Sequence, residues 1–178
     1  MKIVSIFDDH IYSIEYDGSN EHELSNLFEK WNDTEFLYNF FIENKPDLDN
    51  PIWENITVQE AIFTTIEEAS ELEQMFMDEK LCHNLMHKFK PLTRDSVHNE
   101  DYQKNKLYGP FKPSWLRIYA IRMDSDCYII TGGAIKLTKS MDMRTHTKME
   151  LNKLERVRDF LIENGICDNI GINDFIEF

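Results

Sequence analysis

Residues 115–139, WLRIYAIRMDSDCYIITGGAIKLTK, decide the fold of this chain because all of their local signals agree. Two runs rich in isoleucine, tyrosine and other β-forming residues flank a polar turn at 124–126. This pattern predicts a β-hairpin. The same stretch carries four basic residues in an acidic protein: Arg117, Arg122, Lys136 and Lys139. The hairpin is therefore the first place to look for a ligand site.

The rest of the chain predicts a second hairpin and four helices. Two short β-like runs, 2–7 and 11–16, are separated by Asp8-Asp9-His10. Apolar residues then recur at helical spacing in segments 21–31, 34–44, 57–89 and 147–164. The apolar phase shifts near residue 79, so a kink or break is expected there.

Helix ends are marked by side chains that can cap them. Capping-box pairs precede three of the helices, and they are Asn20 with Glu23, Thr57 with Glu60, and Thr147 with Glu150. Asp33 can cap the helix at 34–44, and Gly165 predicts a left-handed end for the last helix. Segment 90–114 is polar and without a clear period, and the tail at 171–178 predicts either an edge strand or an irregular end.

These elements predict an α+β fold in which helices pack on an antiparallel sheet that includes the hairpin. The chain has 178 residues, of which 42% are hydrophobic and 12% aromatic, with only six glycines and five prolines. This length and composition predict one globular domain spanning residues 1–178.

Composition also bears on the cellular setting. No apolar run approaches the roughly 20 residues that span a bilayer, and no signal peptide opens the chain, so we expect a cytoplasmic protein without membrane contact. The three cysteines, Cys82, Cys127 and Cys167, are widely spaced and suggest neither a disulfide framework nor a metal knuckle.

Charge is divided unevenly along the chain. The net charge is −14, which argues against general affinity for nucleic acids. Residues 1–100 hold 7 basic and 22 acidic side chains, whereas residues 104–158 hold 12 basic and 5 acidic ones. This split is compatible with an anionic ligand at the basic segment. Alternatively, acidic helices simply keep the protein soluble.

Four residues in and after the hairpin have the chemistry that phosphoryl transfer on RNA requires: Arg117, Tyr119, Lys136 and His146. Such a reaction needs a base, an acid and cations that stabilise charge on the phosphate. Strand alternation places Arg117 and Tyr119 on one face and Arg122 on the other, and predicts that Lys136 and Lys139 oppose each other. The alternative is an amphipathic strand whose basic residues are merely solvated.

Two other features have structural as well as functional interpretations. Gly132-Gly133 interrupts the second strand of the hairpin, which predicts a β-bulge or a close backbone approach by a ligand. Glu79, His83 and His87 share one helix face and either bind zinc or are solvated; the segment lacks the glutamate of HExxH. Neither a P-loop nor a GxSxG or GxGxxG motif is present. We expect no cofactor and no metal.

The segments LRIYAIR, CYIITGGAIKLTK and HTKMELNKLERVRDFL resemble the RelE/ParE superfamily, particularly its HigB and phage-derived RelE-like branch. The likeness spans about residues 115–164 and rests on Arg117-Ile118-Tyr119, the acidic turn, the aliphatic strand and the basic segment around Lys136. It implies a RelE-like core, mainly 107–166 plus the N-terminal strands, with a small antiparallel sheet covered on one face. The acidic helical region 20–90 would be an elaboration that could cover the basic face.

The resemblance also implies a function. Many members are toxins that cleave mRNA on the ribosome without a metal and are paired with an antitoxin. In this chain Arg117 would bind phosphate, Lys136 would be a second cation, and Tyr119 and His146 would be acid or base candidates. Leu137 stands where the family has a second lysine. This departure favours the alternative, a non-catalytic protein-interaction module on the same scaffold.

Overall fold

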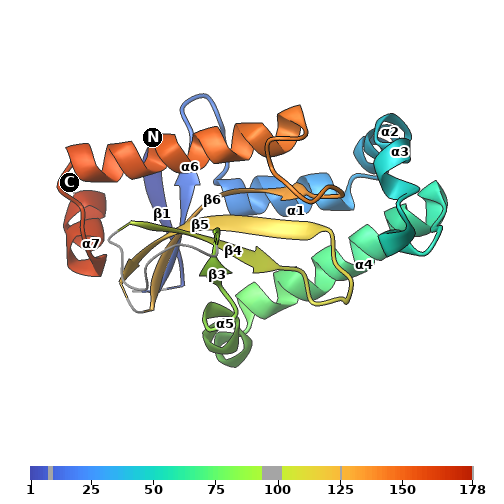
Figure 1. Ribbon diagram of the computed structural model, residues 1–178. Coiled ribbons are helices and arrows are strands. Elements are labelled where there is room, and N and C mark those ends of the chain that lie inside the picture. The colour runs from blue at the N-terminus through green and yellow to red at the C-terminus, as the bar shows by residue number, and fades with distance from the viewer. Residues whose placement is uncertain (8–9, 94–101, 125, 178) are drawn as a thin grey trace.

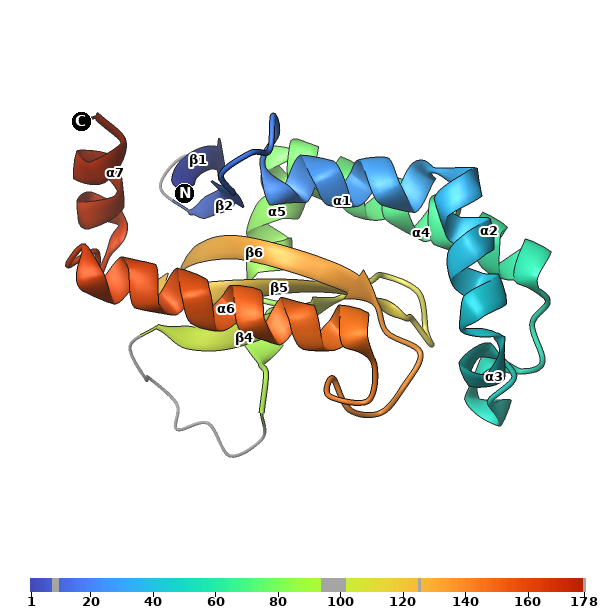
Figure 2. The ribbon, with the colours of Figure 1, turned by 90° about the horizontal axis from the view of Figure 1, so that it is seen from above.

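The computed structural model describes residues 1–7, 10–93, 102–124 and 126–177, and these form a six-stranded sheet between two layers of helices (Figures 1 and 2). The predicted α+β fold is confirmed. The strands are β1 (Lys2–Phe7), β2 (Ile11–Glu15), β3 (Lys90–Pro91), β4 (Gln103–Tyr108), β5 (Leu116–Asp124) and β6 (Cys127–Ile135).

Both predicted hairpins form, and the hairpin of β5 and β6 lies at the centre of the sheet. The strand order is β1-β2-β6-β5-β4-β3. Neighbouring strands are antiparallel except β2 and β6, which run parallel with Ile11 opposite Tyr128. Parallel neighbours need a long connection. Here the chain between β2 and β6 contains the N-terminal helices, β3, β4 and β5, so no single local pattern specifies this pairing.

Helices cover both faces of the sheet. One face carries the N-terminal helices α1 (Glu23–Asn32), α2 (Thr34–Glu43), α3 (Lys45–Leu48), α4 (Val58–Met77) and α5 (Glu79–Met86). The other face carries α6 (Thr145–Glu163), while α7 (Asn169–Glu177) contacts β1 (Figure 2). Among the described residues, no helix is long and apolar enough to cross a bilayer.

Alternation along β5 explains why two helical layers are needed. Leu116, Ile118 and Ala120 belong to the core beneath the N-terminal helices, whereas Tyr119 and Ile121 belong to the core beneath α6. A strand that is apolar on both sides is stable only when both faces are covered. The single covered face implied by the RelE-like resemblance is therefore not what this chain adopts.

A β-bulge interrupts β6 at the predicted glycines. Tyr119 pairs with Gly132 and the next residue, Ala120, pairs with Ile130, which leaves Thr131 as the extra residue. A Cβ atom at Gly132 would overlap the carboxylate of Glu150, and one at Gly133 would collide with the backbone of β5. The close approach to these glycines is thus made by the protein itself.

Some helix boundaries differ from the prediction because tertiary contacts recruit the expected capping residues. The Thr57–Glu60 capping box of α4 and the Asp33 cap of α2 are confirmed, and Asp78 marks the break before α5. However, His22 caps α1 in place of the predicted Asn20. Glu23 instead forms an ion pair with Lys153 at 2.6 Å. Likewise α6 begins at Thr145, before the predicted box. Gly165 has the expected positive φ of 67°.

Two segments adopt structure that periodicity did not predict. The polar stretch 90–114 contains β4, whose residues Gln103 and Asn105 are buried although polar. Asn105 donates a hydrogen bond to the carbonyl of Gln103 at 2.9 Å, so its amide is satisfied inside the fold. The tail forms helix α7, and neither of the two predicted alternatives is correct.

Beneath the bulge lies a buried cluster of charges. Lys153 bridges Glu23 at 2.6 Å and Glu150 at 3.0 Å. Burial raises the pKa of Glu150 from its ordinary 4.5 to about 7, although Lys153 opposes that shift. The ring of Tyr16 lies 5.6 Å from Lys153 Nζ, and its hydroxyl donates a hydrogen bond to the carbonyl of Thr131 at 2.9 Å.

The core assignment of α4 predicts the effect of truncating Leu72, which is 1% exposed. Leu72→Ala should lower the free energy of unfolding by about 2–5 kcal/mol because it removes buried apolar surface and leaves a cavity. Leu81→Ala, at a residue 44% exposed on α5, is the matched control and should cost less than about 1 kcal/mol. Urea denaturation followed by circular dichroism measures both, and equal losses would contradict the assigned core.

The Glu150 pKa predicts how stability depends on pH. Its pKa is higher in the folded than in the unfolded chain, so the folded state binds more protons between about pH 4.5 and 7. The free energy of unfolding should fall across this window by at most about 3 kcal/mol and change no further above it. Glu150→Gln should remove this component, so the variant's free energy of unfolding should depend less on pH than that of the wild type when both are denatured at several pH values between 4.5 and 7. A parallel curve for the variant would refute the assignment.

Candidate anion-binding site

Three of the four predicted site residues line one cavity of about 390 Å³: Arg117, Tyr119 and Lys136. The cavity lies where β4 and β5 meet the segment between β6 and α6. Arg117 and Tyr119 share a face of β5, as alternation predicted. Lys106, Tyr108 and Lys139 also line the cavity, so cations from three segments converge there.

Arg117 is held by main-chain carbonyls. Its Nη1 donates hydrogen bonds to the carbonyls of Ser114 at 2.9 Å and Leu116 at 2.6 Å. The guanidinium lies 3.8 Å from the ring centroid of Tyr108, at cation–π distance. Burial lowers the pKa of Arg117, yet an arginine side chain stays charged. A guanidinium has five donor hydrogens, so these bonds orient it without using all of them.

The neighbouring lysines are also held by carbonyls. Lys136 Nζ donates to the carbonyls of Thr138 at 2.5 Å and Lys139 at 2.7 Å, and Lys106 Nζ donates to that of Leu92 at 2.9 Å. Burial, followed by repulsion from Arg117 and Lys106, lowers the pKa of Lys136. Within the described chain, none of these three cations forms an ion pair with a carboxylate. An anion in the cavity would relieve their mutual repulsion.

Tyr119 adds a hydrogen-bond donor. Its side chain is fully buried, and its hydroxyl has no hydrogen-bond partner among the residues that the structure describes. Burial raises the pKa of this phenol well above its ordinary value, so the group remains protonated. A buried hydroxyl without a partner is unfavourable. A ligand oxygen in the cavity would supply the missing acceptor.

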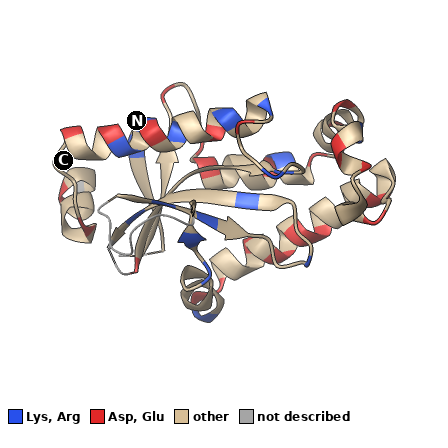
Figure 3. Ribbon diagram, in the orientation of Figure 1, with Lys and Arg blue, Asp and Glu red and all other residues tan. Residues whose placement is uncertain are grey.

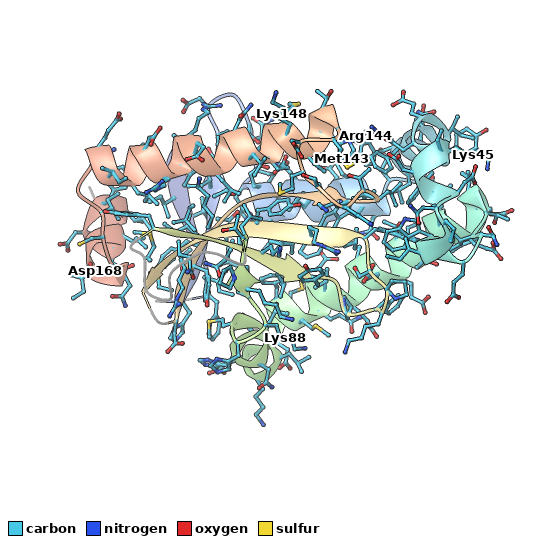
Figure 4. The ribbon with its side chains drawn as sticks, in the orientation of Figure 1. Lys45, Lys88, Met143, Arg144, Lys148 and Asp168 are labelled. Atoms are coloured by element: carbon cyan, nitrogen blue, oxygen red, sulfur yellow. The ribbon has the colours of Figure 1, made fainter. Side chains whose placement is uncertain are left out.

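His146 lies elsewhere. Its Nε2 is 3.0 Å from the carbonyl of Ile135, and its ring packs edge-on against Phe40 with centroids 5.1 Å apart. It lines a separate hollow beside Arg144, which binds both carboxylate oxygens of Asp47 at 2.6 and 2.7 Å. Figure 4 labels Arg144 at the start of α6. Because α6 starts at Thr145, its first turn carries His146 toward α2 and away from Arg117.

The structure also corrects the expected directions of the lysines. Lys136 and Lys139 both line the cavity because β6 ends at Ile135 and strand alternation no longer applies beyond it. Sequence reasoning missed Lys106 and Tyr108. The signal that could have revealed them is the sequence KNKLY at 104–108. Its alternate residues Lys104, Lys106 and Tyr108 are basic or aromatic and lie on one face of β4.

Of the two histidines considered for a metal site, His83 lies on α5 and His87 follows its last residue as the C-cap. His83 packs against the rings of Phe7 and His10, with centroids 5.2 Å apart in each case. In the part of the chain that the structure describes, no three metal-binding side chains come together.

The N-terminal helices do not cover the cations. They pack on the opposite face of the sheet, and α4 shows a line of acidic residues along it (Figure 3). Asp47 of α3 and Trp53, which precedes α4, border a further hollow of about 420 Å³ that shares Arg117 and Lys136 with the first. The acidic region therefore flanks the site without closing it.

Comparisons of the chain with protein-family models, curated proteins and solved structures gave no match. The function must therefore be argued from the site.

The arrangement is better suited to binding negative charge than to transferring protons. Asp142 is the carboxylate among the described residues that line the cavity, and a hydrogen bond from Ser140 lowers its pKa. A carboxylate with a lowered pKa is a weak base. The site's chemical strength is electrostatic stabilisation by Arg117, Lys136 and Lys106, with Tyr119 as a donor.

The unpartnered hydroxyl of Tyr119 predicts how its removal affects stability, and Tyr16, whose hydroxyl is hydrogen-bonded, is the control. Tyr119→Phe should leave the free energy of unfolding unchanged or raise it by about 1 kcal/mol, because a buried donor without an acceptor is removed. Tyr16→Phe breaks the bond to Thr131 and should lower it by about 1–3 kcal/mol. Chemical denaturation compares the two. A larger loss for Tyr119→Phe would show that its hydroxyl is satisfied in the free protein.

Proposed function

We propose that this protein binds RNA through the Arg117 cavity and acts as a RelE- and HigB-like component of a toxin–antitoxin system. The observation that carries the proposal is the convergence of Arg117, Lys136 and Tyr119 on one cavity that also contains Lys106. In the described chain none of these cations forms a close ion pair with a carboxylate, although the protein has a net charge of −14 and Glu68 interacts with Arg117 at longer range. A phosphate supplies the charge and the acceptors that they lack.

As a ribonuclease, the protein would act mainly through charge stabilisation and without a metal. Attack of the RNA 2′ oxygen on the adjacent phosphorus breaks the bond to the 5′ oxygen of the next nucleotide and forms a cyclic phosphate. The 2′ hydroxyl would give its proton to water, and water would protonate the departing 5′ oxygen. Arg117 and Lys136 would stabilise the negative charge that builds on the phosphate oxygens, and Tyr119 would donate a hydrogen bond to one of them. His146 takes no part because it lies outside the cavity.

The proposal includes partners and a setting. The substrate would be mRNA on the ribosome in the cytoplasm. A cognate antitoxin would inhibit the protein by placing acidic side chains over the cations, since opposite charges meet across interfaces of this kind. The N-terminal helices pack on the other face of the sheet and do not do so themselves.

A second candidate is a binding module that retains the cations but does not cleave. Two observations favour it: His146 is engaged with the carbonyl of Ile135, and Leu137, at the position of the family's second lysine, is buried in the core. Such a module would present the acidic outer face of α4 to a basic partner protein (Figure 3).

Growth arrest after induced expression in a bacterial host separates the two candidates. The wild type should arrest growth, and Arg117→Ala and Lys136→Ala should relieve the arrest at matched protein levels. Arg156→Ala is the control because that arginine is exposed on α6 and does not line the cavity. Purified ribosomes carrying mRNA should show cleavage that each cavity variant reduces by about 10²-fold or more.

Harmless accumulation of the wild type, together with intact mRNA on ribosomes, would refute ribonuclease activity and leave the binding module. Arrest that survives both cavity substitutions would place any toxicity outside this cavity.

A further inference from the structure

A second, larger cavity adjoins the first. It has a volume of about 740 Å³ and shares Tyr108 and Arg117 with the first cavity. It lies on the other side of Tyr108, between the end of α5 and loop 109–114. Its charged lining residues in the described chain are all basic: Lys88, Lys90, Lys112 and Arg117. This is unexpected in a protein with a net charge of −14, so the basic lining continues beyond the first cavity.

The walls of this second cavity are apolar and aromatic. Trp53 and Phe111 line it together with aliphatic residues of α4 and α5. The indole Nε1 of Trp53 is buried and has no acceptor among the residues that the structure describes. Flat aromatic walls favour a planar ring, and a buried N–H group favours a ligand that carries an acceptor. Nucleobases have both properties.

Tyr108 connects the two cavities and is surrounded by cations. The residue is 40% exposed, and the centroid of its ring lies 3.8 Å from the Arg117 guanidinium and 5.8 Å from each of Lys90 and Lys106. Lys90 and Lys106 pair directly across β3 and β4. Like charges directly opposite each other destabilise a sheet. This unfavourable pairing is offset when a negative group lies between the two lysines.

From these contacts we infer that the second cavity holds the base and the phosphate of the neighbouring nucleotide on the same strand. The ligand is thus single-stranded and at least two nucleotides long, and it crosses Tyr108 from Lys136 to Lys112. This inference rests on the proposed RNA binding at the Arg117 cavity. Exposed aromatic rings between cations are the usual platform for unpaired nucleic acid.

Other anionic ligands fit this surface less well. Duplex RNA keeps its bases stacked inside the helix, so it could contact the cations but could not fill the cavity beside Trp53. An acidic peptide would satisfy the cations and leave the aromatic walls without a planar partner. A lone phosphate would occupy only one of the two cavities.

Binding of ligands of increasing length tests the inference. A fluorescently labelled hexaribonucleotide with 2′-O-methyl groups resists cleavage by 2′-oxygen attack, and fluorescence anisotropy reports its affinity at fixed salt. It should bind at least tenfold more tightly than uridine monophosphate, measured by competition. Lys88→Ala combined with Lys112→Ala should weaken hexanucleotide binding about tenfold and leave the mononucleotide within twofold. The salt slope should fall by about 0.7, which is the contribution of one single-strand phosphate contact.

A matched double variant, Lys30→Ala with Arg156→Ala, removes two exposed cations from α1 and α6 and should leave hexanucleotide affinity within twofold. Trp53→Phe retains an aromatic ring, removes the N–H group and should also weaken the hexanucleotide selectively.

The outcomes separate the two proposals. Equal affinity for hexanucleotide and mononucleotide, or equal losses in both double variants, would overturn the second subsite while RNA binding at Arg117 stands. No binding of either ligand would overturn the proposed function itself. A hexa-aspartate peptide that competes as well as the hexanucleotide would overturn the assignment of a base to this cavity.

Discussion

Burial of the central hairpin on both faces is the constraint on which the rest of this structure depends. Alternate residues of β5 enter two separate cores, so helices must cover each side of the sheet. The N-terminal helices cover one side, and α6 covers the other. Because α6 begins only at Thr145, the segment after Ile135 loops around the end of the hairpin, and the cavity forms there. The position of the cavity thus follows from the residue at which α6 begins.

How far the fold could be predicted depended on the range of the interactions involved. The hairpin of β5 and β6, the capping box at Thr57 and the left-handed end at Gly165 are set by neighbouring residues, and each was predicted correctly. The parallel pairing of β2 with β6 and the strand β4 were not, because they depend on partners far along the chain. Buried Gln103 and Asn105 resemble loop residues until their hydrogen bonds are known.

The range of the interactions also decided which parts of the site could be predicted. Alternation along one strand was sufficient to place Arg117 and Tyr119 together. Lys136 joins them only because β6 ends before it, and Lys106 arrives on a strand whose pairing with β5 was not foreseen. His146 shows the converse: its residue type suits the chemistry, but the rotation of α6 directs it toward Phe40. Residue chemistry was readable from the sequence, whereas convergence required the tertiary fold.

An acidic protein can still bind a polyanion when its cations are local and its carboxylates are distant. Charges at a protein surface are screened over about 8–10 Å at physiological ionic strength. Glu68 of α4 is buried and interacts electrostatically with Arg117, whereas the exposed acidic face of α4 lies across the sheet from Lys106 (Figure 3). That same charge repels any duplex that approaches the outer surface, where no cavity compensates. If the protein binds RNA as proposed, its overall acidity would disfavour ligands that stay at the outer surface, and a strand would gain affinity by entering beside Tyr108, where Lys106, Arg117 and Lys136 are held by carbonyls.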